Sequence, residues 1–299
     1  MALVDMREML KDAKKRKYAI GSFDVSNNEM VCAVVEVAEE LQAPIILAAI
    51  PPDLERVGVD ELAALTTLAA KKATVPICVL LDHAGDMNLI RDAIAGGFTS
   101  VMFDGSRLTF SENVRQTQKV CEYAHARNVS VEAELGHVSY TAGCREDGQP
   151  TESQGTSETS TDPKDLLTDP QEVVEFVEKT GVDALAVAIG TIHGIYTKKP
   201  EIDFERLKVI RDAVPEVPLV LHGGSGTPDE DIKKVIALGI CKINIFSEVV
   251  EAFFTSLKAQ LNSLEKMSTW PHIVFKEPVK AMREIIRKKI VLFGSDRKA

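Results

Sequence analysis

The chain has 299 residues, of which 45% are apolar and 27% are charged. A chain of this size and composition buries a large core, which excludes a disordered protein and a small disulfide-stapled module. Its 45 acidic and 35 basic side chains give a net charge of −10, which repels nucleic acid. The longest apolar runs are shorter than the ~20 residues of a membrane span, and the N-terminal segment lacks the apolar pattern of a signal peptide. We therefore expect a soluble, cytoplasmic protein that binds neither nucleic acid nor membranes.

Short apolar, β-branched runs alternate with helical patterns along the whole chain. The predicted strands are 18–25, 44–50, 76–83, 100–106, 130–136, 184–190, 218–223 and 242–247. The predicted helices are 28–41, 59–73, 86–95, 111–127, 170–180, 204–213, 228–238 and one from 248 onward. The chain therefore contains eight strand–helix units in succession.

Strands that are apolar on both faces and separated by helices indicate a parallel sheet, and eight such units predict a closed (β/α)8 TIM barrel of the α/β class. A Rossmann fold would need a GxGxxG motif after the first strand, and 23–26 (FDVS) has none. Beyond the eighth helix, 260–278 is expected to be irregular and 279–293 to form an extra C-terminal helix. We expect a single domain over 1–299, with 137–168 as a long mobile loop that acts as a lid.

Chemically active side chains gather where the predicted strands end. The carboxyl ends of all eight strands converge on one rim of a barrel, so residues far apart in sequence meet there. Three of the six histidines, His83, His193 and His222, lie at such ends, and a fourth, His137, opens the long loop. A single histidine is more often a hydrogen-bonded structural residue than a ligand. Three imidazoles on one rim, however, form the ligand set of a catalytic zinc, and nearby carboxylates orient them or act as acid and base.

A glycine-rich segment follows the seventh predicted strand. Small residues in 223–227 (GGSGT) let backbone N–H groups approach a phosphate, although a plain turn uses the same residues. With Asn244 and Ser247 after the eighth strand, this segment lies where barrels often build a phosphate site. A metal site and a phosphate site on one rim indicate chemistry on a sugar phosphate, in which the cation polarises a carbonyl and stabilises an enediolate.

Longer motifs follow one another along nearly the whole chain. They are 23–30 (FDVSNNEM), 81–83 (LDH), 102–106 (MFDGS), 131–136 (VEAELG), 184–194 (ALAVAIGTIHG), 218–226 (PLVLHGGSG), 242–248 (KINIFSE) and 293–295 (FGS). In this order they resemble the class II, metal-dependent ketose-phosphate aldolases, the family that contains fructose-bisphosphate and tagatose-bisphosphate aldolases. The resemblance implies a lyase that cleaves a phosphorylated ketose reversibly into dihydroxyacetone phosphate and an aldehyde.

The resemblance also implies roles for individual residues. The implied zinc ligands are His83, His193 and His222, with Glu134 near the metal as an alternative ion position. Asp82 would exchange a proton with the oxygen at the bond being cleaved. Glu146, in the long loop, is the nearest match to the glutamate that moves the proton of the dihydroxyacetone phosphate carbon, and a solvated surface charge is the alternative. The implied substrate and phosphate contacts are Asp24, Gly194, Gly223, Gly224, Ser225, Asn244 and Ser247. We also expect that the protein binds a monovalent cation (Na⁺ or K⁺) and that it assembles as a homodimer or homotetramer.

Several departures from the family bear on the substrate. The family commonly has Asn where this chain has Asp24, a serine near the end of the second strand where it has 49–50 (AI), and Asp-Thr or Ala-Thr where it has 246–247 (FS). Fructose-bisphosphate enzymes of one branch also place an arginine where this chain has Val250. The end of the eighth strand is therefore closer to the tagatose-bisphosphate branch, and the distal half of the sugar is expected to be unusual or to lack its second phosphate.

Other functions remain open at the level of sequence. An aldolase for a longer-chain ketose 1-phosphate and a non-catalytic barrel that binds sugar phosphates are the alternatives, and an intact Asp82 argues against the latter. A Schiff-base aldolase needs a desolvated lysine at the carboxyl end of a strand, whereas Lys242 is expected at the amino end of the eighth strand. An amidohydrolase would need an HxH motif on its first strand, which is absent.

Overall fold

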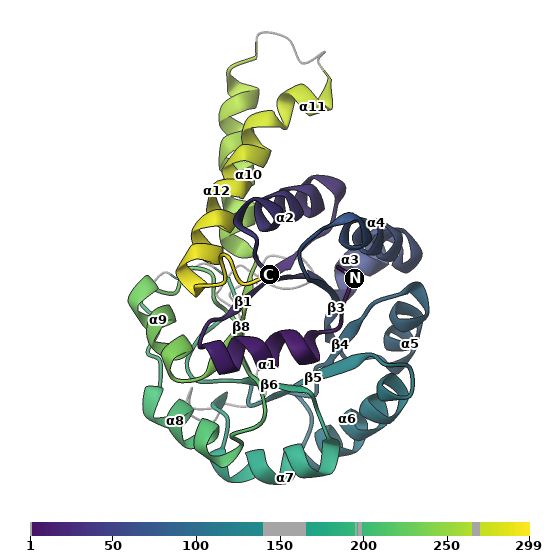
Figure 1. The fold of residues 1–299 in the computed structure, drawn as a ribbon, viewed down its shortest axis with the longest axis vertical. Helices are drawn as coiled ribbons and strands as arrows, with labels where there is room; N and C mark the ends of the chain where they lie inside the picture. The colour runs from purple at the N-terminus through teal and green to yellow at the C-terminus, as the bar shows by residue number, and fades with distance from the viewer. Residues whose placement is uncertain (1, 140–165, 195, 197–198, 265–269) are drawn as a thin grey trace, which may run out of the picture.

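The computed structural model describes residues 2–139, 166–194, 196, 199–264 and 270–299. Eight parallel strands form a closed barrel in chain order, in which β8 pairs again with β1 (Figure 1). The strands are β1 Ile20–Asp24, β2 Ile45–Ala49, β3 Ile77–Ala84, β4 Ser100–Phe103, β5 Ser130–Leu135, β6 Ala184–Val187, β7 Leu219–Leu221 and β8 Ile240–Ile245. The predicted (β/α)8 barrel is confirmed, and every predicted strand overlaps an observed one.

Helices surround the barrel and connect its strands (Figure 1). The connecting helices are α2 Asn28–Leu41, α4 Val59–Lys72, α5 Met87–Gly96, α6 Phe110–His125, α7 Pro170–Thr180, α8 Phe204–Ala213, α9 Asp229–Ala237 and α10 Ser247–Asn262. Side-chain hydrogen bonds determine where several of these helices begin. The Asn27 side chain accepts the N–H of Met30 before α2, and the Asp169 side chain accepts the N–H of Gln171 before α7. Such N-caps satisfy amides that have no partner inside the helix, so these helices begin where the sequence predicts.

Within the described ranges, four helices lie outside the eight strand–helix units. They are α1 Met6–Arg16, α3 Pro51–Val57, α11 Pro271–Val274 and α12 Lys276–Phe293. The extra C-terminal helix is confirmed as α12, but the prediction that 260–278 is irregular is wrong, because α10 continues to Asn262 and α12 already begins at Lys276. None of the helices in the described ranges combines the length and apolar character that a membrane crossing requires.

The α1 helix closes the barrel where the strands begin, and charged side chains are buried farther along the strands. The α1 helix crosses the amino end of the barrel (Figure 1), with Met6 and Leu10 fully buried. The N–H of Met6 lies 3.2 Å from the hydroxyl of Ser100 and 3.3 Å from that of Ser130, the first residues of β4 and β5. From the middle of the strands to their carboxyl ends, the buried polar side chains include Asp82, Glu132, Glu134, His222, Lys242 and Asn244. Among the described residues, the buried charged side chains of the barrel therefore lie beyond its amino end, which α1 covers.

The α12 helix packs along α10 and α2 on the outside of the barrel (Figure 1). Arg283 pairs with Glu36 at 2.8 Å and Arg287 pairs with Glu40 at 2.6 Å, which joins α12 to α2. The upper parts of α10 and α12 project away from the barrel together with α11 (Figure 1). The C-terminal helices are thus anchored to the barrel at one end and stand free of it at the other.

Candidate metal centre

The end of β3 brings two successive side chains to the same site. Oδ2 of Asp82 accepts a hydrogen bond from Nδ2 of Asn244 in β8 at 2.6 Å, while the His83 ring packs against two other histidines. Successive strand residues normally point to opposite faces. Here the pairing of β3 with β4 shifts between Leu81 and Ala84, and His83 has a φ of +50°. This irregularity lets both side chains reach the rim.

Three imidazoles from three different strand ends lie together. The ring centres of His83 and His222 are 4.6 Å apart, those of His83 and His193 are 5.1 Å apart, and those of His193 and His222 are 5.8 Å apart. One nitrogen atom of each ring lies within 4.8 Å of the other two. Imidazole nitrogens bind zinc at about 2.0–2.1 Å, so a single ion can bridge these three after small side-chain adjustments.

Two carboxylates determine which ring nitrogens remain for a metal. Nδ1 of His83 lies 3.0 Å from Oδ2 of Asp104, which leaves Nε2. Nε2 of His222 lies 3.0 Å from Oε1 of Glu132, which leaves Nδ1. Carboxylates that bond the far nitrogen of an imidazole orient the ring and raise its basicity as a ligand. The residues present therefore fit a divalent cation.

Two histidines of this group, His83 and His193, have pKa values that are shifted in opposite directions. Burial acts to lower the pKa of His83, but the negative charge of Asp82 and the hydrogen bond to Asp104 outweigh it, so the pKa is raised well above its ordinary value. Burial lowers the pKa of His193 well below its ordinary value. Metal binding requires neutral imidazoles, so protonation of His83 and binding of a cation would compete with each other.

Strand β5 contributes two buried carboxylates. Glu132 and Glu134 are two positions apart and share one face of the strand. Oε2 of Glu134 lies 3.3 Å from Nδ1 of His222, and its Oε1 accepts the N–H of Val138 at 3.0 Å. Oε2 of Glu132 lies 2.9 Å from Nζ of Lys242. Glu134 therefore lies beside Nδ1 of His222, the nitrogen left for a metal. Glu132 lies between the His222 ring and the ammonium group of Lys242.

Lys242 is buried inside the barrel as the third of the six residues of β8, two positions farther along the strand than the amino-end place predicted. Burial acts to lower the pKa of its amine, but the charges of Glu132 and Asp82 outweigh burial and raise the pKa. A protonated amine has no electron pair for a Schiff base. The structure thus disfavours a Schiff-base aldolase for a reason other than the one expected.

Asp82 is fully buried, with one carboxylate oxygen held and the other not. Oδ2 is bonded by Asn244, and Oδ1 has no hydrogen-bond partner within the described part of the chain. Burial acts to raise the pKa of Asp82, but the charges of Lys242 and of the neighbouring histidines outweigh it and lower the pKa to about 2. An ionised carboxylate with a free oxygen beside the imidazoles is arranged to accept a proton.

Asp24 ends β1 next to this carboxylate. Its Oδ1 is buried and makes no hydrogen bond to any described residue. Burial, and after it the negative charge of Asp82, raise the pKa of Asp24 to about 8. A carboxyl group whose pKa is raised in this way holds a proton more readily, and when protonated it can donate a hydrogen bond. The family commonly has Asn at this position, and an Asn side chain also donates hydrogen bonds. Asp24 in its protonated form would therefore keep a hydrogen-bond donor at this position.

Gly223 and Gly224, which follow β7, lie too close to neighbouring atoms for a residue with a side chain. Gly223 has a φ of +67°, and a Cβ atom there would lie 2.4 Å from the carbonyl oxygen of Ile192. A Cβ atom on Gly224 would lie 2.5 Å from the Ile243 side chain, and the N–H of Gly224 donates to the carbonyl of Asn244 at 3.2 Å. In this conformation the N–H of Gly224 is therefore already bonded to Asn244 and does not point to a phosphate as a free donor.

The start of α10 lies against the same segment. Oγ of Ser225 accepts the N–H of Phe246 at 3.2 Å, and Ser247 is the first residue of α10, which has no side-chain cap. Unsatisfied N–H groups at a helix N-terminus favour an anion. On the neighbouring loop, Gly194 follows His193 with a φ of +101°. Ser225, Ser247 and Gly194 thus remain candidate phosphate contacts.

Glu146 lies outside the described residues, so the structure does not place it. The first residues of the long loop are described and are bonded to the metal centre. The carbonyl of Ser139 accepts the N–H of His193 at 2.7 Å, and Nδ1 of His137 lies 3.0 Å from Oγ of Ser106. The loop therefore begins on the rim where the strands end.

The model of the class-II fructose-bisphosphate aldolase family matches residues 4–298. The chain belongs to this family. It is 38% identical to the YdjI aldolase from Escherichia coli K12, with a TM-score of 0.84 and 99% of each chain covered. It is 29% identical to a candidate fructose-1,6-biphosphate aldolase from Coccidioides immitis, with a TM-score of 0.83, 97% of this chain covered and 96% of the other.

A more distant structure, fructose-bisphosphate aldolase from Campylobacter jejuni, shares the fold. The identity is 21% and the TM-score 0.78, with 100% of this chain and 97% of that chain covered. Family membership confirms the expected class: this chain is an aldolase, and hence a lyase. Class II aldolases depend on a metal and act on phosphorylated sugars, and the histidine cluster is the candidate metal centre of this aldolase.

Sequence reasoning did not assign a role to several residues that organise the centre. Asp104 and Glu132 were visible at strand ends, and the alternation of Glu132 with Glu134 marked both as inward-facing. Nothing in the sequence marked Tyr196. Its hydroxyl accepts the N–H of Ile192 at 2.9 Å and donates to the carbonyl of Gly223 at 2.9 Å. Tyr196 thereby joins the loops that carry His193 and His222, which only the folded barrel brings together.

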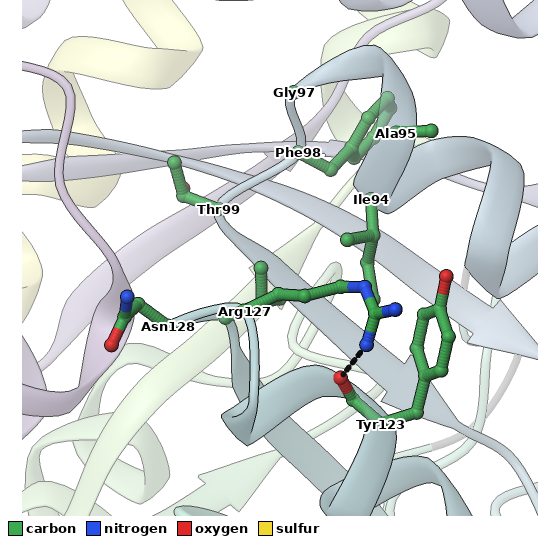
Figure 2. Close-up of a pocket in the computed structure, with 9 residues that line it drawn as sticks. Ile94, Ala95, Gly97, Phe98, Thr99, Tyr123, Arg127 and Asn128 are labelled. Carbon is green, nitrogen blue, oxygen red and sulfur yellow. Dashed lines mark hydrogen bonds between the residues drawn. The ribbon is translucent and has the colours of Figure 1, made fainter.

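A cavity of 370 Å³ lies away from this centre (Figure 2). Thr99 and Val129 line it, and they directly precede β4 and β5, so the cavity opens where strands begin. The Arg127 guanidinium lies 3.6 Å from the centre of the Tyr123 ring and donates to the Tyr123 carbonyl at 3.0 Å. The chemical residues of the aldolase lie at the other end of the barrel, so this cavity takes no part in its reaction.

Proposed function

We propose that this aldolase uses zinc to cleave a phosphorylated ketose reversibly into dihydroxyacetone phosphate and an aldehyde. The observation that carries the proposal is the convergence of three imidazole nitrogens within 4.8 Å of one another beside the buried Asp82 carboxylate. Three imidazoles with an open fourth position are typical of a catalytic zinc, with His83, His193 and His222 as ligands and Glu134 as an alternative position. When bound, the metal polarises the ketose carbonyl.

Asp82 moves the proton at the bond that breaks. Its Oδ1 atom takes the proton from the hydroxyl group on the carbon that becomes the aldehyde, and the electron pair of the broken carbon–carbon bond stays with the dihydroxyacetone phosphate carbon. Asn244 holds Oδ2, and the charge of Lys242 keeps the carboxylate ionised before the transfer. In synthesis, Asp82 returns the proton to the aldehyde oxygen. Glu146 is our candidate for the group that moves the proton at the dihydroxyacetone phosphate carbon.

The phosphate of the substrate binds between the 223–227 segment and the start of α10. Ser225, Ser247 and the unsatisfied amides of the helix provide donors, and the polar contacts between the segment and β8 hold the two together. The residues that shape this site are Gly194, Gly223, Gly224 and Asn244. Asp24, in its protonated form, donates to a substrate oxygen.

Metal dependence is the experiment that tests this function. Removal of metal by a chelator should abolish release of dihydroxyacetone phosphate from a panel of ketose phosphates, and zinc or cobalt should restore it, because the histidines hold the Lewis acid. Borohydride added with substrate should leave no adduct. Full activity after verified metal removal would contradict the mechanism, and metal-loaded protein that cleaves no ketose phosphate would favour a non-catalytic sugar-phosphate-binding barrel.

The substrate is closer to that of the tagatose-bisphosphate branch than to fructose 1,6-bisphosphate. Phe246 and Val250, at the positions that differ from the fructose-bisphosphate enzymes, are partly buried against the core of the barrel. Neither side chain offers a charge or a hydrogen bond to a second phosphate. A longer-chain ketose 1-phosphate is the other candidate that this apolar surface favours.

The chain forms one domain, because α12 is bonded to α2 and the N–H of Ala19, before β1, donates to the carbonyl of Phe293 at 3.0 Å.

The protein assembles as a homodimer or homotetramer, which the exposed apolar side chains on its projecting helices favour. We place the reaction in the cytoplasm, as expected from the sequence.

A further inference from the structure

Glu248, in the first turn of α10, links the phosphate segment to the C-terminal helix. Its carboxylate accepts the N–H of Gly226, the residue that follows Ser225. From the opposite side, Nζ of Lys289 in α12 lies 2.9 Å from Oε1 and 2.7 Å from Oε2 of the same carboxylate. The Lys289 side chain is 8% exposed and the Glu248 side chain 21% exposed, so water screens this pair only in part.

The position of Glu248 creates an electrostatic conflict. A carboxylate bonded to the segment that binds phosphate has the same sign of charge as the phosphate group. Like charges near a partly buried site repel each other several times more strongly than in bulk water. Lys289, in α12, compensates the charge of Glu248. Removing one partner of a shielded ion pair leaves the other charge uncompensated, so loss of Lys289 would leave the negative charge of Glu248 beside the phosphate segment.

We propose that Lys289 is a positioning residue for phosphate binding. It neutralises Glu248, which can then hold the Gly226 amide without repelling the phosphate of the substrate. The inference rests on the proposed phosphate site and gives the C-terminal helix a role in substrate affinity. Neither Lys289 nor Glu248 belongs to the histidine cluster, so the effect should appear in KM and leave kcat almost unchanged.

Two single variants test the inference because their expected effects have opposite signs. Lys289→Met removes the compensating charge and keeps most of the apolar stem. We expect it to weaken binding of inorganic phosphate by about tenfold and to raise KM for the ketose phosphate by a similar factor, with kcat changed less than about twofold. Glu248→Gln keeps an oxygen that accepts the Gly226 amide and leaves the lysine charge unopposed. We expect this variant to bind phosphate at least as tightly as the wild type.

The double variant Lys289→Met/Glu248→Gln has neither charge, so we expect its phosphate affinity to return to within about twofold of the wild type. Lys288→Met is the matched control, because Lys288 is an exposed neighbour on the same helix. A pair that merely tethers α12 to α10 would weaken phosphate binding in both single variants, and that outcome would overturn the inference. If Lys289→Met does not fold, weaker phosphate binding by Glu248→Gln alone would overturn it.

Calorimetric titration with inorganic phosphate measures binding without turnover, so the result is independent of aldol cleavage. Equal affinity in the wild type and in Lys289→Met would overturn the inference and leave the phosphate site in place. A wild type that binds no phosphate would remove both the proposed phosphate site and the inference. Metal content and thermal unfolding of each variant show that a change in affinity does not come from loss of the metal or of the fold.

Discussion

Asn244 holds Oδ2 of the buried Asp82 side chain, while Oδ1 has no hydrogen-bond partner among the described residues. Replacement by asparagine preserves the shape of the side chain and removes its ability to take a proton. We expect Asp82→Asn to retain the fold and the bound metal and to lose cleavage by about 100-fold or more, the usual scale for a general acid–base group. The measurement is the steady-state release of dihydroxyacetone phosphate, together with the metal content of the purified variant.

The control for this variant is Asp60→Asn, which makes the same change at an exposed position in the first turn of α4. It should leave the rate unchanged. If Asp82→Asn lost metal but regained full activity on reconstitution, Asp82 would have a structural role, and the proton would have to move through another group.

Phe246 and Val250 lead to a prediction about substrate choice. An apolar side chain cannot replace a hydrogen-bonding group without leaving polar atoms of the substrate unpaired, at a cost of about 1–3 kcal/mol each. We expect kcat/KM for fructose 1,6-bisphosphate to be at least tenfold below that of the best ketose phosphate. Comparison with tagatose 1,6-bisphosphate and longer-chain ketose 1-phosphates tests this. A value for fructose 1,6-bisphosphate equal to the best would show that Phe246 does not face the distal part of the sugar.

Single residues at strand ends could be predicted, but their partners could not. His83, His193 and His222 stand out because the end of a barrel strand is defined by local sequence. Which carboxylate bonds which ring depends on the stagger of the strands and on side-chain direction, neither of which is local. The pairing of Asp104 with His83, and of Glu132 with both His222 and Lys242, therefore required the structure.

At the scale of elements, α1 shows that a local signal does not reveal where a helix docks. Met6, Met9, Leu10 and Ala13 have helical spacing, and the side chain of Asp5 caps the helix by accepting the N–H of Arg7. From the sequence, this segment shows only that it lacks the apolar pattern of a signal peptide. Packing of α1 across the barrel depends on strands that come later in the chain, and α3 and α11 are too short to show a periodic pattern.

Because α1 closes the apolar end of the barrel, we expect truncation of its buried face to reduce stability without changing the metal centre. Leu10 is fully buried, and Leu10→Ala should lower the free energy of unfolding by about 2–5 kcal/mol. Denaturant unfolding measures this loss, and metal content should stay at the wild-type value. The control is Lys11→Ala, at an exposed position on the same helix. A loss of metal in Leu10→Ala would indicate coupling between the two ends of the barrel.

At the scale of the whole molecule, closure of the barrel creates the centre. The bond between Asp82 and Asn244 joins residues that are 162 positions apart, and the ion pair of Glu132 with Lys242 joins residues that are 110 positions apart. Eight successive strand–helix units sufficed to predict that such residues share a rim. The projecting part of α10 and α12 could not be predicted in this way, because it extends away from the strands of the barrel (Figure 1).

That projecting part leads to a prediction about assembly. Phe254 on α10 is 60% exposed and Trp270, just before α11, is 72% exposed, and apolar side chains grouped on a surface mark interaction sites. Light scattering should show a homodimer or homotetramer, and Phe254→Ser should shift it toward smaller species. Val209→Ser is the matched control, since Val209 is 55% exposed on α8, away from the projection. A monomeric wild type, or dissociation by Val209→Ser and not by Phe254→Ser, would show that the projecting helices do not hold the assembly together.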